Sequence, residues 1–145
     1  MCSKVQMTDT YYFLGIGGIG MSALARYFMA QGHRVMGYDR TPSALTYALE
    51  EEGIAIQYED CTAWVETLDK NTTLVVRTPA VPTNTTIYCY LQEHGFVMYK
   101  RAEVLGLITR QKKALCVAGT HGKTTTSTIL AHMLHPSHVG ANAFL

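Results

Sequence analysis

The chain has 145 residues, of which 48% are hydrophobic and 16% charged, and its formal net charge is +1. This composition is typical of a globular domain with a packed core and argues against disorder. A charge so close to zero provides no general field for nucleic acid or an anionic membrane, and no apolar run is long enough to span a bilayer.

Short apolar runs alternate with amphipathic stretches from the start of the chain. We expect a buried strand at 11–14, a helix at 21–31 that ends at Gly32, and a second strand at 34–38. The next helix is expected to begin with Thr41 as N-cap and to run to residue 52.

The alternation continues along the next sixty or so residues, at the spacing expected of βαβ units. The expected elements are a strand at 54–58, a short helix at 62–68, a strand at 74–76, a helix at 85–94, a strand at 96–99 and a helix at 102–110. This pattern predicts an α/β fold, a Rossmann-like parallel sheet flanked by helices. Ligands of such sheets bind at the carboxyl ends of the strands.

A polar stretch at 109–113 interrupts this pattern. We interpret it as a boundary, with residues 1–110 forming the first domain and 111–145 the start of a P-loop ATP-binding domain. In the second part we expect a strand at 114–118, a glycine loop, and a helix from residue 123 to 134.

The first strand leads into a glycine loop with the pattern G-x-G-x-x-G at Gly15, Gly17 and Gly20. Gly15 permits a tight turn, Gly17 lets the backbone approach a pyrophosphate, and Gly20 lets the helix pack close to the strand. Asp39 stands at the tip of the second strand, where a carboxylate accepts hydrogen bonds from a ribose. NAD, FAD and a UDP-sugar all carry a pyrophosphate, so this pattern leaves the ligand open.

A second phosphate loop, Gly119-Thr120-His121-Gly122-Lys123-Thr124-Thr125, precedes the last expected helix. Backbone N–H groups of such a loop cradle phosphates, Lys123 reaches the β and γ oxygens, and the Thr124 hydroxyl is placed for Mg²⁺. The general pattern has glycine where this chain has Val117, so the loop is a shorter variant. We interpret His121 as a loop residue and not as a catalyst.

The remaining histidines and the cysteines show no pattern of a metal site. His132, His135 and His138 have no accompanying carboxylate or thiol, and a proline breaks the helix between the last two. The four cysteines, at positions 2, 61, 89 and 116, are widely spaced, which is typical of reduced thiols in a cytoplasmic protein. Residues 1–6 contain no apolar segment of a secretory signal.

Four segments together resemble the Mur ligase family, and the resemblance extends from Tyr12 to Leu145. They are FLGIGGIGMSALARYFMAQGHRVMGYD, TPAVP, YKRAEVLGLI and VAGTHGKTTTSTILAHML. The sequence Gly-Thr-His-Gly-Lys-Thr-Thr is the family's own form of the P-loop, which accounts for Val117. The family usually has Gly-Ser-Asp where this chain has Gly37-Tyr38-Asp39, and often Gly-His where it has Glu59-Asp60. The resemblance therefore does not define which residues of this chain contact uridine.

The resemblance implies specific roles for the residues that match the family's motifs. The first domain would bind a UDP-sugar through Gly15, Gly17, Gly18 and Gly20 at the pyrophosphate, Asp39 by the uridine, and Thr78 and Arg101 at phosphate. ATP would be bound by Gly119, Thr120, His121, Gly122, Lys123, Thr124 and Thr125, with Lys123 catalytic and Thr124 a ligand of Mg²⁺.

The implied reaction is ATP-dependent joining of L-alanine to UDP-N-acetylmuramate in the bacterial cytoplasm, for peptidoglycan precursor synthesis. ATP phosphorylates the muramate carboxylate, the amine of L-alanine attacks the acyl phosphate, and phosphate leaves. The segment 20–25 favours this member over a ligase that attaches a recycled peptide to the same sugar. A nicotinamide-binding Rossmann domain of an oxidoreductase and a non-catalytic nucleotide sensor remain alternatives.

The resemblance also implies further domains beyond residue 145. We therefore expect an N-terminal fragment that does not ligate alone. Its last helix would present Ile129, Met133 and Leu134 without their proper cover, which predicts self-association.

Overall fold

A computed structural model of the chain describes residues 8–111, 119 and 121–134. The chain divides into two units, Met1–Leu105 and Gly106–Leu145. The division lies within a helix, and the expected domain boundary after residue 110 stays a prediction.

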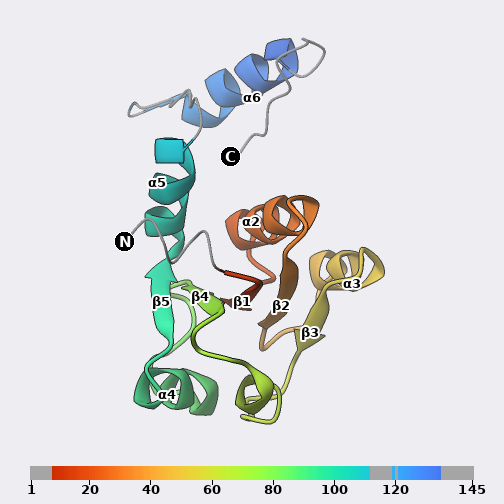
Figure 1. Cartoon of the computed structure of the whole chain (residues 1–145). Coiled ribbons are helices and arrows are strands. Elements are labelled where there is room, and N and C mark those ends of the chain that lie inside the picture. The colour runs from red at the N-terminus through yellow and green to blue at the C-terminus, as the bar shows by residue number, and fades with distance from the viewer. Residues whose placement is uncertain (1–7, 112–118, 120, 135–145) are drawn as a thin grey trace. The chain divides into compact units, whose positions relative to one another are not determined.

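The first unit is built on a five-stranded parallel sheet with the order β3-β2-β1-β4-β5 (Figure 1). The strands are β1 Thr10–Leu14, β2 Arg34–Tyr38, β3 Ala55–Gln57, β4 Thr73–Arg77 and β5 Val97–Lys100. The helices are α2 Ile19–Ala30, α3 Ala44–Glu51, the single 3₁₀ turn η1 Val65–Thr67, α4 Thr86–Glu93 and α5 Arg101–Gln111. This is the strand order of a Rossmann-like mononucleotide-binding unit, as the sequence predicted.

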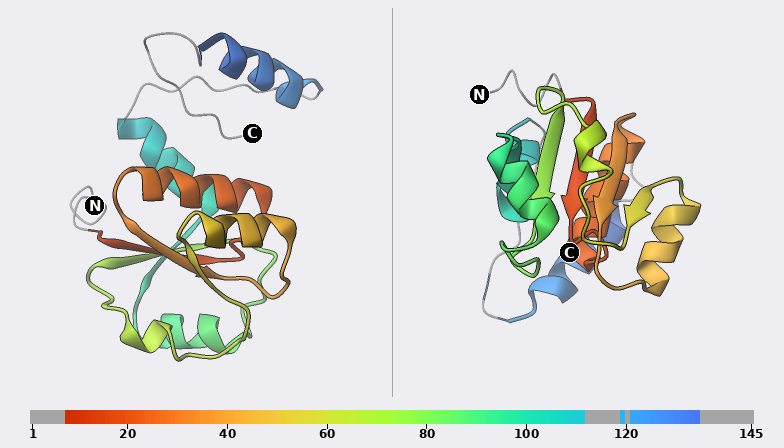
Figure 2. Two further views of the ribbon diagram at one scale, coloured as in Figure 1. Left: turned by 90° about the vertical axis from the view of Figure 1, so that its right-hand side faces the viewer. Right: turned by 90° about the horizontal axis from the view of Figure 1, so that it is seen from below.

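Strand β1 lies at the centre of the sheet, and all five of its residues are buried. Figure 2 shows why: α2 and α3 cover one face of the sheet, and α4 and η1 cover the other. Tyr11 stacks on Phe28 of α2, with ring centroids 3.8 Å apart, whereas Tyr12 and Leu14 belong to the cluster packed against α4. A strand covered on both faces has no polar side to alternate with, which explains its continuous apolar run.

The expected start of the second helix was wrong. Helix α3 has Ser43 as its N-cap, in a capping box with Thr46, and not Thr41. The Ser43 hydroxyl accepts a hydrogen bond from the Thr46 backbone N–H at 3.2 Å, and the Thr46 hydroxyl accepts from Ser43 N–H at 2.8 Å. Thr41 donates its own N–H to Oδ1 of Asp39 at 2.9 Å, which holds it in a turn before the helix.

The helix expected at 62–68 was also too long, because only η1 forms there. Its closing hydrogen bonds run from Thr67 N–H to Trp64 O and from Leu68 N–H to Val65 O, which is the spacing of a 3₁₀ turn. Val65 is fully buried in the cluster beneath the sheet. One turn is enough to place this side chain, so packing of Val65 sets the short element.

Substitution of Tyr12 by phenylalanine should stabilise the first unit. Tyr12 is fully buried, and its hydroxyl has no hydrogen-bond partner among the described residues. Removal of an unpartnered buried hydroxyl should raise the free energy of unfolding by about 1 kcal/mol. Burial, and to a smaller extent Cys61, Tyr38 and Asp60, raise the pKa of Tyr12 above its ordinary value of 10.

Because the pKa of Tyr12 is raised in the folded protein, its effect on the free energy of unfolding depends on pH. The contribution of a neutral Tyr12 to stability is complete below pH 10 and is lost as the pH rises above that value. We therefore expect urea unfolding to show that the free energy of unfolding falls less between neutral and alkaline pH for Tyr12→Phe than for the parent. Tyr47→Phe, at a residue that is 55% exposed, serves as the control and should change little. A less stable Tyr12→Phe variant would mean that the hydroxyl binds an ordered water.

The second unit contains α6, Lys123–Leu134, which matches the range that the sequence predicted. Gly119 and Gly122 precede it with φ angles of 155° and 74°, and Thr126 N–H donates to Gly122 O at 3.0 Å. The strand expected at 114–118 lies outside the described residues. Ile129 and Met133 are 57% and 68% exposed, and self-association through this face stays a prediction.

Candidate functional site

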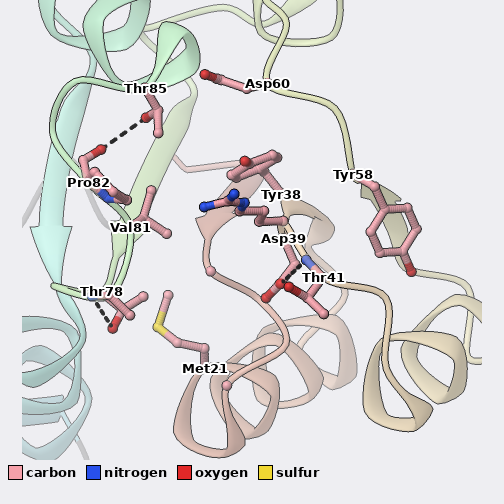
Figure 3. Close-up of a pocket in the computed structure, with 14 residues that line it drawn as sticks. Met21, Tyr38, Asp39, Thr41, Tyr58, Asp60, Thr78, Val81, Pro82 and Thr85 are labelled. Atoms are coloured by element: carbon pink, nitrogen blue, oxygen red, sulfur yellow. Dashed lines mark hydrogen bonds between the residues drawn. The ribbon is translucent and has the colours of Figure 1, made fainter.

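A cavity of about 650 Å³ opens in the first unit, where the chain leaves the carboxyl ends of the strands (Figure 3). Strands β1 and β4 are neighbours there, and the chain proceeds from them in opposite directions along the sheet. The cavity is lined by Gly15, Gly18, Met21, Tyr38, Asp39, Arg40, Thr41, Tyr58, Asp60, Thr78, Ala80, Val81, Pro82 and Thr85. Its position is the topological switch point, where open α/β sheets bind ligands.

The Asp39 carboxylate holds one wall of this cavity together. Its Oδ2 accepts from the Gly17 backbone N–H at 2.8 Å, and its Oδ1 accepts from Thr41 N–H at 2.9 Å. A β-carbon at Gly17 would lie only 2.6 Å from Oδ2 of Asp39. Gly17 is therefore required for a close approach to Asp39, and its N–H is already engaged without a pyrophosphate.

Gly15 and Thr78 meet at the opposite wall. Gly15 has a φ of +87°, and its N–H donates to Tyr38 O at 2.8 Å, which bends the chain sharply after β1. Thr78 N–H donates to Leu14 O at 3.3 Å. A β-carbon at Gly15 would overlap the Thr78 methyl group, so a larger residue is excluded both by the backbone and by this neighbour. The structure thus brings Gly15, Thr78, Gly18 and Asp39 around one cavity.

Arg101 lies against Gly20 in the first turn of α2, between Gly18 and Met21, which line the cavity. A β-carbon at Gly20 would lie 2.5 Å from Nη1 of Arg101. The atoms nearest to this β-carbon all belong to Arg101, and the interpretation of Gly20 as a site of close helix–strand packing stays a prediction. A cation at a helix N-terminus is electrostatically unfavourable, since the backbone N–H groups there carry positive charge. A bound anion would relieve that repulsion.

Sequence reasoning missed the role of Asp60. Its Oδ2 accepts from Thr86 N–H at 2.7 Å and its Oδ1 from Ile87 N–H at 2.9 Å, so it caps α4 from a distant segment. Thr85, the local N-cap residue, makes no side-chain hydrogen bond to the helix. No local pattern marks such a cap, because the carboxylate and the helix are separated by 26 residues.

Three charged groups influence the pKa of Tyr38, which lines the cavity (Figure 3). Burial has the largest effect and raises the pKa of Tyr38, and Asp60 and Asp39 raise it further. Arg40 acts in the opposite direction and lowers it. The cavity is therefore lined by two carboxylates and one guanidinium, of which Asp39 and Arg40 follow β2 and Asp60 contacts the start of α4.

The expected ATP residues lie in the second unit, at the start of α6. His121, Gly122, Lys123, Thr124 and Thr125 are all exposed, as is Gly119, whereas Thr120 lies outside the described residues. The Thr124 carbonyl accepts from the Thr128 hydroxyl at 2.7 Å. Among the residues that the structure describes, no group of three or more histidines, cysteines or acids is arranged to hold a metal ion.

Two of the four cysteines, Cys61 and Cys89, are described, and both are half-buried free thiols. Within the described ranges, no helix has the length and apolar character needed to cross a membrane.

The parallel sheet, the glycine loop between its central strand and first helix, and the cavity at the switch point define a Rossmann-like nucleotide-binding unit. A family model described as "Mur ligase family, catalytic domain" matches residues 10–113. The chain belongs to the Mur ligase family.

Relatives with similar sequences carry one name. The chain is 58% identical over 143 residues to the UDP-N-acetylmuramate–L-alanine ligase of Phocaeicola vulgatus and 59% identical to that of Parabacteroides distasonis. Each comparison covers 97% of this chain but only 31% of the relative. The chain therefore spans about a third of the length of these ligases.

Solved structures of two ligases resemble the fold. A UDP-N-acetylmuramate-alanine ligase from Thermotoga maritima gives a TM-score of 0.74 at 31% identity, over 86% of this chain and 29% of that protein. A murein peptide ligase from Psychrobacter arcticus gives 0.78 at 31% identity, over 88% of this chain and 26% of that protein.

Proposed function

We propose that the first unit binds the UDP-sugar substrate of an ATP-dependent ligase that joins L-alanine to UDP-N-acetylmuramate. The observation that carries this proposal is the placement of Arg101 against the N-terminus of α2, beside a cavity at the switch point. A guanidinium and free helix N–H groups together form a site for a diphosphate. The names of the relatives at 58% and 59% identity supply the particular sugar and amino acid.

In this proposal the nucleoside occupies the cavity and the diphosphate lies over the start of α2. Gly15 and Gly18 line the cavity on the side of that helix, and Thr78, at the end of β4, contacts Gly15. Gly17 orders the loop through Asp39. These residues position the substrate and leave the chemistry to groups outside the first unit.

ATP would bind at the start of α6. The helix N-terminus and the exposed Lys123 suit a triphosphate, and the Thr124 hydroxyl, which makes no hydrogen bond to any described residue, suits one coordination position of Mg²⁺. Mg²⁺ takes its other ligands from phosphate oxygens, water and carboxylates, and none of the described residues forms an acidic cluster here. When bound, ATP supplies the phosphoryl group that activates the muramate carboxylate, and Lys123 neutralises phosphate charge.

A ligase that attaches a peptide to the same sugar is the second candidate. The similarity to a murein peptide ligase, with a TM-score of 0.78, favours it as an alternative. In both cases the product would be a cytoplasmic precursor of peptidoglycan. Membership of the Mur ligase family does not support the earlier nicotinamide alternative.

Calorimetric titration with UDP-N-acetylmuramate tests the proposal, with NAD as the parallel ligand. We expect the UDP-sugar to bind and NAD to give no heat of binding. Binding of NAD alone would overturn the proposal. Competition between L-alanine and a tripeptide, in the ligase that contains these residues and with the products analysed by mass spectrometry, would then separate the two ligases.

A further inference from the structure

The carboxylate at the end of β2 is already engaged within the protein. Each oxygen of Asp39 accepts a backbone hydrogen bond, one from Gly17 and one from Thr41. These bonds fix the glycine loop and the turn before α3. Asp39 is therefore a positioning residue in this structure, and each of its oxygens keeps a second acceptor site that faces no described partner.

Arg40 is the neighbouring residue and is not engaged. It lines the cavity and is exposed. Its side chain makes no hydrogen bond or ion pair with any residue that the structure describes, and Tyr38 lines the same cavity. A free guanidinium inside a ligand cavity has both its planar face and its N–H donors available.

The position of Arg40 separates it from the groups suited to phosphate. The glycine loop follows β1 and Arg101 follows β5, whereas Arg40 follows β2, next to β3. Aromatic rings of Tyr38 and Tyr58 line this side of the cavity. Planar groups of this kind are suited to a nucleobase, because bases stack on aromatic rings and on guanidinium planes.

We propose that Arg40 recognises the nucleoside by placing its guanidinium plane against the nucleobase, while Asp39 holds the loop. This assignment rests on the proposed function, since it takes a uridine nucleotide as the ligand. It makes Arg40 a determinant of affinity for every ligand that contains uridine, whatever is attached to the phosphates.

The test compares Arg40→Met and Arg40→Lys with the parent chain, using calorimetric titration with UDP-N-acetylmuramate, UDP and UMP. We expect Arg40→Met to weaken all three by about tenfold and by the same factor, because the lost contact is to the base that they share. Arg40→Lys keeps the charge but not the plane, so it should remain weak. Arg34→Met is the matched control, because Arg34 is exposed at the opposite end of β2 and should leave all three affinities unchanged.

Each other outcome has a distinct meaning. Unchanged affinity in Arg40→Met, or full recovery in Arg40→Lys, would overturn the stacking assignment alone. A loss that grows from UMP to UDP would assign Arg40 to phosphate instead. NADP binding by the parent that disappears in Arg40→Met would assign it to a 2′-phosphate. Failure of the parent to bind any uridine nucleotide would overturn the proposed function, and the assignment with it.

Discussion

Replacement of Gly37 by alanine should destabilise the first unit by about 3 kcal/mol. Gly37 lies in β2 directly opposite Phe13 of β1, and a β-carbon there would lie 2.7 Å from the Phe13 carbonyl oxygen. It would also lie 2.9 Å from Cδ1 of Ile16. A backbone oxygen in the central strand cannot rotate away, so the two strands would have to separate.

Urea unfolding followed by the fluorescence of Trp64, the only tryptophan of the chain, would measure this loss. Gly106→Ala is the matched control, because no atom lies within 4 Å of a β-carbon at that position in α5. Alanine favours a helix over glycine, so the control should stabilise α5 by about 0.5–1 kcal/mol. A Gly37→Ala variant as stable as the parent would show that β1 and β2 adjust without cost.

Substitution of Lys123 by methionine should reduce ligation by about 100-fold or more in the ligase that contains these residues. Lys123 begins α6, where its ammonium adds to the positive end of the helix, and phosphoryl transfer depends on neutralisation of phosphate charge. Phosphate release dependent on L-alanine would report the loss. Affinity for UDP-N-acetylmuramate should stay unchanged, because the residues proposed to bind it lie in the first unit.

Lys70→Met provides a control for the loss of one lysine. Lys70 is exposed in the turn before β4 and lies outside the cavity. If Lys123→Met kept its activity, the P-loop interpretation of residues 119–125 would be wrong. If both activity and sugar binding fell together, Lys123 would act on the fold and not on ATP.

Local signals in the sequence were sufficient to predict most of the elements. The apolar run that became β1, the glycine that follows α2 and the amphipathic spacing of α6 all act within a few residues. The glycine loop was also recognised from local order, since it stands between a strand and a helix. The sequence therefore predicted the fold class, and the glycine loop that it singled out contributes Gly15 and Gly18 to the cavity.

Errors arose where a local signal competed with a partner elsewhere. Thr41-Pro42 and Ser43 both have the character of a helix start, and the hydrogen bond from Thr41 to Asp39 decided between them. In the same way, the single turn η1, in which only Val65 is buried, replaced a helix of seven residues because the packing of Val65 required no more.

By itself, the sequence determined the order of the described strands and helices, the glycine loop at the end of β1 and the helix that begins at Lys123, because hydrophobic periodicity and glycine act locally. Only the tertiary structure decided how the site is held. Asp60 caps a helix 26 residues away, Arg101 lies across Gly20, and Asp39 engages Gly17. Each of these pairs forms because the parallel sheet brings the ends of separate strands to one edge. The local sequence around one residue does not predict which distant residue will contact it.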